Sequence, residues 1–175
     1  FDRQYGNLPM GYDHKYVYSH FGYNLKATDM QAAIGLAQLE KLPEFVVRRR
    51  ENFEFLGKRL EPYAHRLILP ETCPDSRPSW FGFLITCREG ISRNRLTVDL
   101  EEMGIQTRML FAGNLVRHPC SAELQSPVHY REGAPLSNTD RILNDSFWVG
   151  VYPGLTSSQL ERMADGIIEA LKRQE

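Results

Sequence analysis

Apolar residues recur at helical spacing in two stretches of the first third of the chain. Thr28 and Gln31 form the pattern of a capping box, which predicts that a helix begins directly after Thr28. Proline lacks a backbone N–H and clashes with the preceding turn, so Pro43 is expected to end or kink this helix. A second helical stretch follows and is expected to stop at Pro62. The pattern thus predicts two consecutive helices within residues 28–62.

The spacing of the apolar residues changes beyond residue 63. Short runs rich in β-branched and aromatic residues are bounded there by prolines and glycines, which is typical of strands. Strands are predicted at residues 67–69, 80–86, 105–108 and 147–152. Helical patterns occupy residues 95–103, 138–143 and 156–171, and the last begins with a second capping box, Thr156 to Gln159. This order predicts an α+β fold with helices on one face of a small sheet, whose strand directions stay open.

Composition and charge exclude several classes of function. Lys and Arg number 21 against 22 Asp and Glu, a net charge of −1, so the basic excess that nucleic-acid binding demands is missing. No apolar run approaches the roughly 18 residues of a membrane span, and no signal-peptide pattern is visible, so a cytoplasmic protein is expected. The three cysteines and five histidines lack the spacing of a metal site or a disulfide framework. The chain starts at Phe1 without a methionine, so we expect a piece of a longer protein.

The first 23 residues hold seven of the 19 aromatic residues. Glycines and a proline interrupt this segment, which favours a loop or ribbon packed on a surface. It could be the edge of a core. Alternatively, it faces a ligand or a partner, since tyrosine combines an apolar body with a polar tip.

A few polar residues are candidates for binding. Asn24 lies four residues before Thr28, beside a helix N-terminus of the kind that attracts anions, although it could simply shape an Asx turn. The loop over residues 108–117 carries two arginines, an aromatic ring and an amide between predicted elements, where binding residues tend to occur. The arginine run at residues 48–50 is interpreted as a solvated helix face rather than a phosphate site, given the glutamates around it.

Several segments together resemble a known family. GYDHKYVYSHFGYNLKATDMQAAIGLAQLEKLPEF closely resembles a segment of the CDP-6-deoxy-4-hexulose 3-dehydrases, dehydratases of deoxysugar biosynthesis within the fold-type-I sugar aminotransferase superfamily. SWFGFLIT, TRMLFAGNLVRHP, LSNTDRI and FWVGVYPGLT continue the resemblance in family order. YDHKYVYSH and LFAGNLVR are the parts more particular to the 3-dehydrases.

The resemblance implies the C-terminal part of an enzyme that depends on pyridoxamine or pyridoxal 5'-phosphate. Residues 1–27 would be the end of the large domain, forming a ribbon at the dimer interface and active site. Residues 28–62 would be connecting helices, and residues 63–175 the C-terminal small domain. The implied reaction removes the C3 hydroxyl of a CDP-linked 4-keto-6-deoxyhexose, as in lipopolysaccharide biosynthesis. The implied partners are a second copy in a homodimer and an iron–sulfur flavoprotein reductase.

The resemblance also assigns roles to residues. Asn24 would reach the cofactor phosphate of the other subunit, and Tyr16 and His20 would face that subunit's substrate pocket. Four residues of the 108–117 loop would approach the nucleotide-sugar: Arg108, Phe111, Asn114 and Arg117. The catalytic histidine and the cysteines of a possible 2Fe–2S cluster would precede Phe1, so no catalytic or metal-binding residue is assigned here. The 175-residue chain alone is therefore expected to be inactive.

Two other functions stay open at this point. The same fold could serve transamination of a nucleotide-keto-sugar, with a lysine upstream in place of the histidine. A chain that is complete as it stands would instead be a non-catalytic interaction domain.

Overall fold

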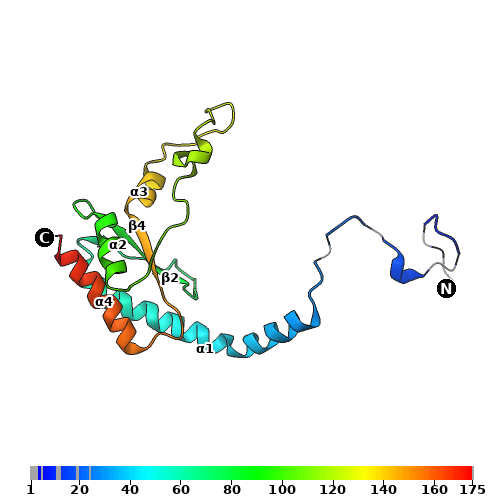
Figure 1. Cartoon of the computed structure of the whole chain (residues 1–175), viewed down its shortest axis with the longest axis horizontal. Coiled ribbons are helices and arrows are strands. Elements are labelled where there is room, and N and C mark those ends of the chain that lie inside the picture. The colour runs from blue at the N-terminus through cyan, green and yellow to red at the C-terminus, as the bar shows by residue number, and fades with distance from the viewer. Residues whose placement is uncertain (1–3, 5, 11–12, 19, 24, 175) are drawn as a thin grey trace. The chain divides into compact units, whose positions relative to one another are not determined.

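The computed structural model describes residues 4, 6–10, 13–18, 20–23 and 25–174 of the 175-residue chain. The chain divides into two compact units, an N-terminal unit (Phe1–Glu40) and a C-terminal unit (Lys41–Glu175) (Figure 1). Helix α1 (Asp29–Leu60) belongs to both.

The N-terminal unit holds the short 3-10 helix η1 (His14–Tyr16) and the first turns of α1. The capping box predicted for this helix is present. The Thr28 backbone N–H donates to the Gln31 side-chain oxygen at 2.9 Å, and the Gln31 N–H donates to Thr28 Oγ1 at 3.3 Å. Most large apolar side chains of the unit are exposed: Met10, Tyr16, Tyr18, Phe21, Tyr23, Leu25, Met30, Ile34, Leu36 and Leu39.

Helix α1 runs without a break through Pro43, so the prediction of two separate helices is wrong. A proline in a helix removes one backbone hydrogen bond, and packing elsewhere along the helix can offset that loss. Leu56 and Leu60 are fully buried in the core, which holds the second half of the helix in place. The predicted stop is confirmed, because α1 ends at Leu60 and the 3-10 helix η2 (Glu61–Tyr63) contains Pro62.

The arginine run of α1 is not a solvated face, which corrects the interpretation from charge pattern. All three guanidinium groups are partly buried and donate to backbone carbonyls of loops that pack beside α1. Arg48 Nη2 donates to Leu155 at 3.1 Å, Arg49 Nη1 to Trp80 at 3.3 Å and Arg50 Nε to Pro78 at 3.0 Å. The three arginines therefore attach two loops to the helix, because their guanidinium groups donate to carbonyls that lie outside any strand or helix.

The sheet is four-stranded and wholly antiparallel, with the order β1-β2-β4-β3. The strands are β1 (Leu67–Ile68), β2 (Gly82–Cys87), β3 (Thr107–Met109) and β4 (Ser146–Gly150). In the central pair, Phe83 lies opposite Val149 and Ile85 lies opposite Phe147. These four side chains point to one face and are buried, whereas Leu84 and Trp148 on the other face are only partly buried.

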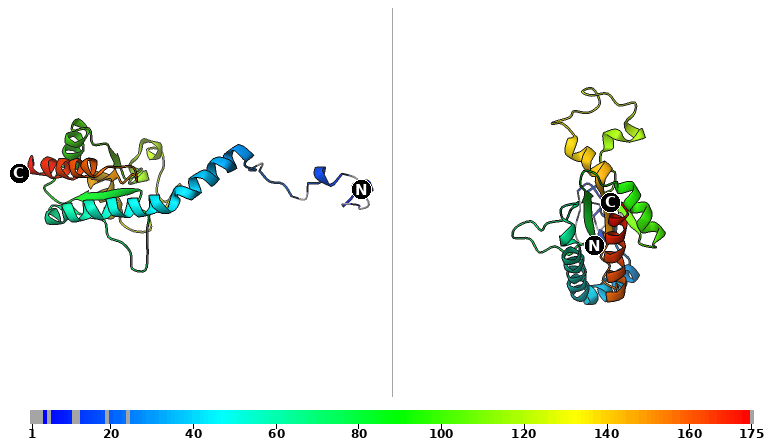
Figure 2. Two further views of the ribbon diagram at one scale, coloured as in Figure 1. Left: turned by 90° about the horizontal axis from the view of Figure 1, so that it is seen from below. Right: turned by 90° about the vertical axis from the view of Figure 1, so that its left-hand side faces the viewer.

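Three more helices complete the unit: α2 (Arg93–Glu102), α3 (Ser137–Asp145) and α4 (Ser157–Lys172) (Figures 1 and 2). Helix α2 ends as predicted, with Gly104 in the left-handed region at φ +75°. The core joins the buried face of the sheet to α1, α2 and α4, which confirms the predicted α+β class. Its main members are Leu56, Leu60, Leu67, Phe83, Ile85, Cys87, Leu96, Leu100, Phe147, Val149, Val151, Ile167 and Leu171.

Candidate functional site

The predicted substrate loop, residues 108–117, covers the end of β3 and the first part of the segment that connects β3 to α3 in the C-terminal unit. Figure 1 shows the short 3-10 turns of this segment, η3 (Leu115–Arg117) and η4 (Pro119–Ser121), next to α3. Arg108 lies on β3 directly opposite Trp148 of β4, on the face that the core does not cover. The Trp148 indole N–H donates to the Met109 carbonyl at 3.1 Å and so fixes the start of the loop. The Arg108 side chain is exposed on this strand.

Phe111 is held in an unusual backbone conformation near the start of this loop, two residues after β3. Its φ is +49°, a left-handed value that a bulky residue adopts only at an energetic cost. Its side chain is nevertheless 84% exposed, so burial of the ring does not offset that cost. Strained backbone of this kind tends to occur where a fold must present a side chain in one direction.

Gly113 brings the loop against α3. Its φ is +61°, and a Cβ atom there would lie only 2.8 Å from the Leu143 Cα. Only glycine fits a backbone that approaches a helix this closely with a positive φ. The two residues after Phe111 therefore turn the loop onto α3.

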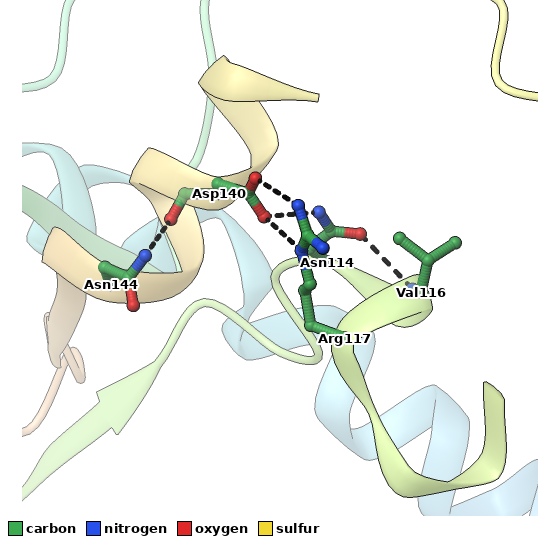
Figure 3. A network of polar contacts seen from close by, with 5 residues as sticks. All are labelled: Asn114, Val116, Arg117, Asp140 and Asn144. Carbon is green, nitrogen blue, oxygen red and sulfur yellow. Dashed lines mark hydrogen bonds and ion pairs between the residues drawn. The ribbon is translucent and has the colours of Figure 1, made fainter. Parts of the chain in front are cut away.

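Asp140 of α3 binds two side chains of the loop (Figure 3). Asn114 is 3% exposed, and its Nδ2 donates to Asp140 Oδ1 at 2.7 Å, while its Oδ1 accepts from the Val116 N–H at 3.2 Å. Arg117 adds a bidentate pair, with Nε 3.0 Å from Oδ1 and Nη2 2.9 Å from Oδ2. The hydrogen bonds from Arg117 and then Asn114 lower the pKa of the Asp140 carboxyl. The carboxylate is therefore charged at neutral pH.

This network occupies the side chains of two predicted substrate contacts, Asn114 and Arg117. The Asn114 amide faces Asp140 and Val116 inside the fold, whereas Arg117 stays more than half exposed beside its ion pair. Of the four predicted contacts in the loop, only Asn114 is buried, while Arg108, Phe111 and Arg117 are exposed. The role of all four at a substrate stays a prediction.

The remaining predicted site residues belong to the N-terminal unit. Tyr16 ends η1 with its side chain 62% exposed, and His20 is exposed as well. Asn24, the predicted cofactor contact, lies outside the described residues. A joint site of Tyr16 and His20 with the loop stays a prediction.

A carbonyl cofactor can form a Schiff base with a lysine amine. Every lysine of the chain is exposed, and Lys15 pairs with Asp13 at 3.1 Å. An amine that forms a Schiff base is usually activated by burial or by another cation, and none of these has such surroundings. The described residues therefore do not fit the covalent part of a pyridoxal phosphate site.

The described residues contain no group of three or more His, Cys, Asp or Glu side chains arranged to hold a metal ion. None of their helices is long and apolar enough to cross a membrane.

Sequence reasoning missed Asp140. An acidic residue in the first turn of a helix is common because the helix dipole favours it, so its local context gave no signal. Only its partners, 23 and 26 residues earlier in the chain, reveal its role.

Comparisons with known proteins point to one family. The model of the DegT/DnrJ/EryC1/StrS aminotransferase family matches residues 3–168. Lipopolysaccharide biosynthesis protein RfbH of Salmonella typhimurium is 55% identical over 163 residues, which are 92% of this chain and 36% of that protein. A dTDP-4-dehydro-2,6-dideoxy-D-glucose 3-dehydratase of Saccharopolyspora spinosa is 46% identical over 171 residues, 97% of this chain and 36% of the relative.

Solved structures share the fold. The E. coli GDP-4-keto-6-deoxy-D-mannose-3-dehydratase with bound hydrated PLP superposes with a TM-score of 0.75 at 23% identity, covering 87% of this chain and 38% of that one. The sugar aminotransferase CalS13 from Micromonospora echinospora gives 0.70 at 24% identity, covering 85% and 37%. At such identities the likeness speaks for the fold alone. The chain spans little more than a third of the length of these proteins.

Proposed function

We propose, since this chain belongs to the DegT/DnrJ/EryC1/StrS aminotransferase family, that it forms part of a nucleotide-sugar 3-dehydratase. The enzyme would remove the C3 hydroxyl of a 4-keto-6-deoxyhexose linked to CDP. The observation that carries this proposal is the 46% identity to a 3-dehydratase along 97% of the chain. Because the chain covers 36% of that relative, it is expected to be inactive alone.

The cofactor we propose is pyridoxamine or pyridoxal 5'-phosphate, which supplies an electron sink for the loss of the hydroxyl. Because the lysines here are all exposed, the groups that bond and stack on the cofactor would come from parts of the enzyme outside this chain. A 2Fe–2S cluster, if the enzyme has one, would lie there too. This chain would contribute Asn24 to the cofactor phosphate of the partner in a homodimer. An iron–sulfur flavoprotein reductase would act on the product.

The loop of the C-terminal unit would meet the nucleotide-sugar. An exposed aromatic ring such as Phe111 can stack on a planar or apolar ligand face, and the Arg108 guanidinium can donate to a phosphate. Asn114 and Arg117 belong to the same loop. Tyr16 and His20 would approach the substrate pocket of the partner.

Product analysis tests the reaction. The complete enzyme, loaded with one equivalent of pyridoxamine 5'-phosphate so that the amine is already present, is incubated with a CDP-4-keto-6-deoxyhexose, and the sugar products are identified by mass spectrometry. A dehydratase releases the C3 oxygen as water and yields a sugar without an amino group. An amino-sugar that keeps its C3 hydroxyl would replace the proposal by transamination, the second reaction that the family name supports.

A second experiment tests the contribution of Asn24 in the complete enzyme. We expect Asn24→Ala to weaken cofactor retention roughly ten- to a hundredfold, since hydrogen bonds to charged acceptors are worth about 1.5–3 kcal/mol. Mixed dimers with a chain disabled at the catalytic position should regain one working site. Inactive mixed dimers of folded chains would contradict the role across subunits.

A further inference from the structure

The contacts of Asp140 concentrate on one loop. Its two carboxylate oxygens accept three hydrogen bonds from Asn114 and Arg117, at 2.7 to 3.0 Å. Asn114 is buried and Arg117 is bound through two parallel bonds, the geometry that gives an arginine–carboxylate pair its directionality. The carboxylate thus fixes both the start and the end of the turn that follows Phe111.

Further contacts hold the rest of the loop in place and leave the ring of Phe111 exposed. Gly113 lies against Leu143, and His118 Nε2 lies 2.6 Å from the Ala112 carbonyl. Upstream, Trp148 binds the Met109 carbonyl. Between these fixed points, Phe111 keeps its left-handed backbone while its side chain stays exposed. A loop that served stability alone would bury this ring or carry a glycine there.

We propose that Asp140 is a positioning residue for substrate binding: it holds the loop on α3 so that Phe111 stands ready as an aromatic surface for the nucleotide-sugar. A ring that is already fixed loses less conformational freedom when the ligand arrives, so its contact contributes more to affinity. This inference rests on the proposed function for its ligand. The positioning itself is a property of the 175-residue chain and can be tested without substrate.

Hydrogen exchange by NMR tests the positioning. In Asp140→Asn, we expect the Val116 and Gly113 amides to exchange about tenfold faster or more, because hydrogen bonds to a charged carboxylate are replaced by weaker ones. The Val149 amide in the centre of the sheet should change little, and the Trp148 indole resonance should shift because its acceptor starts the loop. Arg117→Lys should give a smaller change in the same direction. The matched control is Asp165→Asn, which breaks another aspartate–arginine pair, with Arg59, and should leave the loop unchanged.

Two results would overturn the positioning. One is unchanged exchange of the loop amides in both Asp140→Asn and Arg117→Lys. The other is equal acceleration at Val149 and in the loop, which would mean that Asp140 supports the whole unit.

Steady-state kinetics of the complete enzyme test the ligand. Asp140→Asn should raise KM for the nucleotide-sugar about tenfold with kcat nearly unchanged, since it loosens a binding surface. In a Phe111→Ala background the same change should add almost nothing, because Asp140 would act through Phe111. Additive effects of the two substitutions on KM would contradict the proposal that Asp140 acts through Phe111. If Asp140→Asn loosens the loop but leaves KM normal, the proposed ligand of the loop is wrong. If the complete enzyme forms no dehydrated product at all, the proposed function itself is wrong.

Discussion

At the scale of single residues, Phe111 has an unfavourable left-handed backbone conformation, and a substitution can relieve this strain. Asparagine tolerates left-handed backbone better than phenylalanine does, and the exposed ring contributes little burial. We therefore expect Phe111→Asn to raise the free energy of unfolding by about 1 kcal/mol, measured by urea titration. Leu115→Asn is the control, because Leu115 is exposed in the same loop without a positive φ. An equal gain in both variants would show that reduced surface apolarity, not backbone strain, is the cause.

Cys87 is a residue whose chemistry the fold suppresses. Burial in the core, and secondarily Asp145, raise the pKa of its thiol from 9.0 to about 12. Above pH 9 the unfolded chain would lose this proton while the folded chain keeps it, so stability should fall as pH rises from 9 towards 12. Urea titrations across this range should show the decline, and Cys87→Ala should lack that part of the slope.

The burial of Cys87 also predicts how the three thiols differ in their reaction with a thiol reagent. Cys73 and Cys120 are exposed, so a thiol reagent should modify these two at once and Cys87 only after unfolding. Rapid modification of all three in the folded chain would contradict the buried position.

At the scale of elements, the chain contains a natural pair of capping boxes with the same geometry. Thr156 and Gln159 repeat the bonds of Thr28 and Gln31, with distances of 2.9 and 3.3 Å in both. Helix α4 buries Leu160, Ile167 and Leu171, whereas the first turns of α1 bury nothing among the described residues. Thr156→Ala should therefore lower the free energy of unfolding by about 1 kcal/mol, while Thr28→Ala should leave it almost unchanged. Chemical denaturation measures both, and equal losses would mean that α1 is stabilised along its whole length.

The elements themselves were mostly predictable from the sequence, because capping residues and apolar periodicity act locally. The order of the strands was not, since β2 pairs with β4 across some sixty residues, as between Thr86 and Ser146. The helix end predicted at Pro43 was wrong for the opposite reason, because packing farther along the helix outweighed the local effect of the proline. The candidate loop was found from its residue types, but the partner of Asn114 and Arg117 lies on another element and could not be read from spacing.

At the scale of the whole molecule, apolar exposure is concentrated in one part of the chain. The large apolar side chains between Tyr16 and Leu39 are exposed, while the core begins at Leu56. Apolar surface of this extent favours association. We expect concentration-dependent self-association of the 175-residue chain in sedimentation velocity, and its loss in a chain that begins at Lys41. A monomer at all concentrations would contradict the expectation, and association of the shorter chain would move the contact to the C-terminal unit.

The sheet order has a consequence for synthesis of the chain. Strand β2 lies between β1 and β4, and β1 contributes only two residues to it. Until Ser146–Gly150 has left the ribosome, Phe83 and Ile85 have no full partner strand, although α1, α2 and β3 have already been made. Closing so long a loop is costly before its contacts form, and unpaired strand edges invite aggregation. The nascent polypeptide is thus exposed to misassembly between the synthesis of β2 and that of β4, and a slow codon or a stall between α2 and β4 would prolong the interval in which chaperones must shield β2.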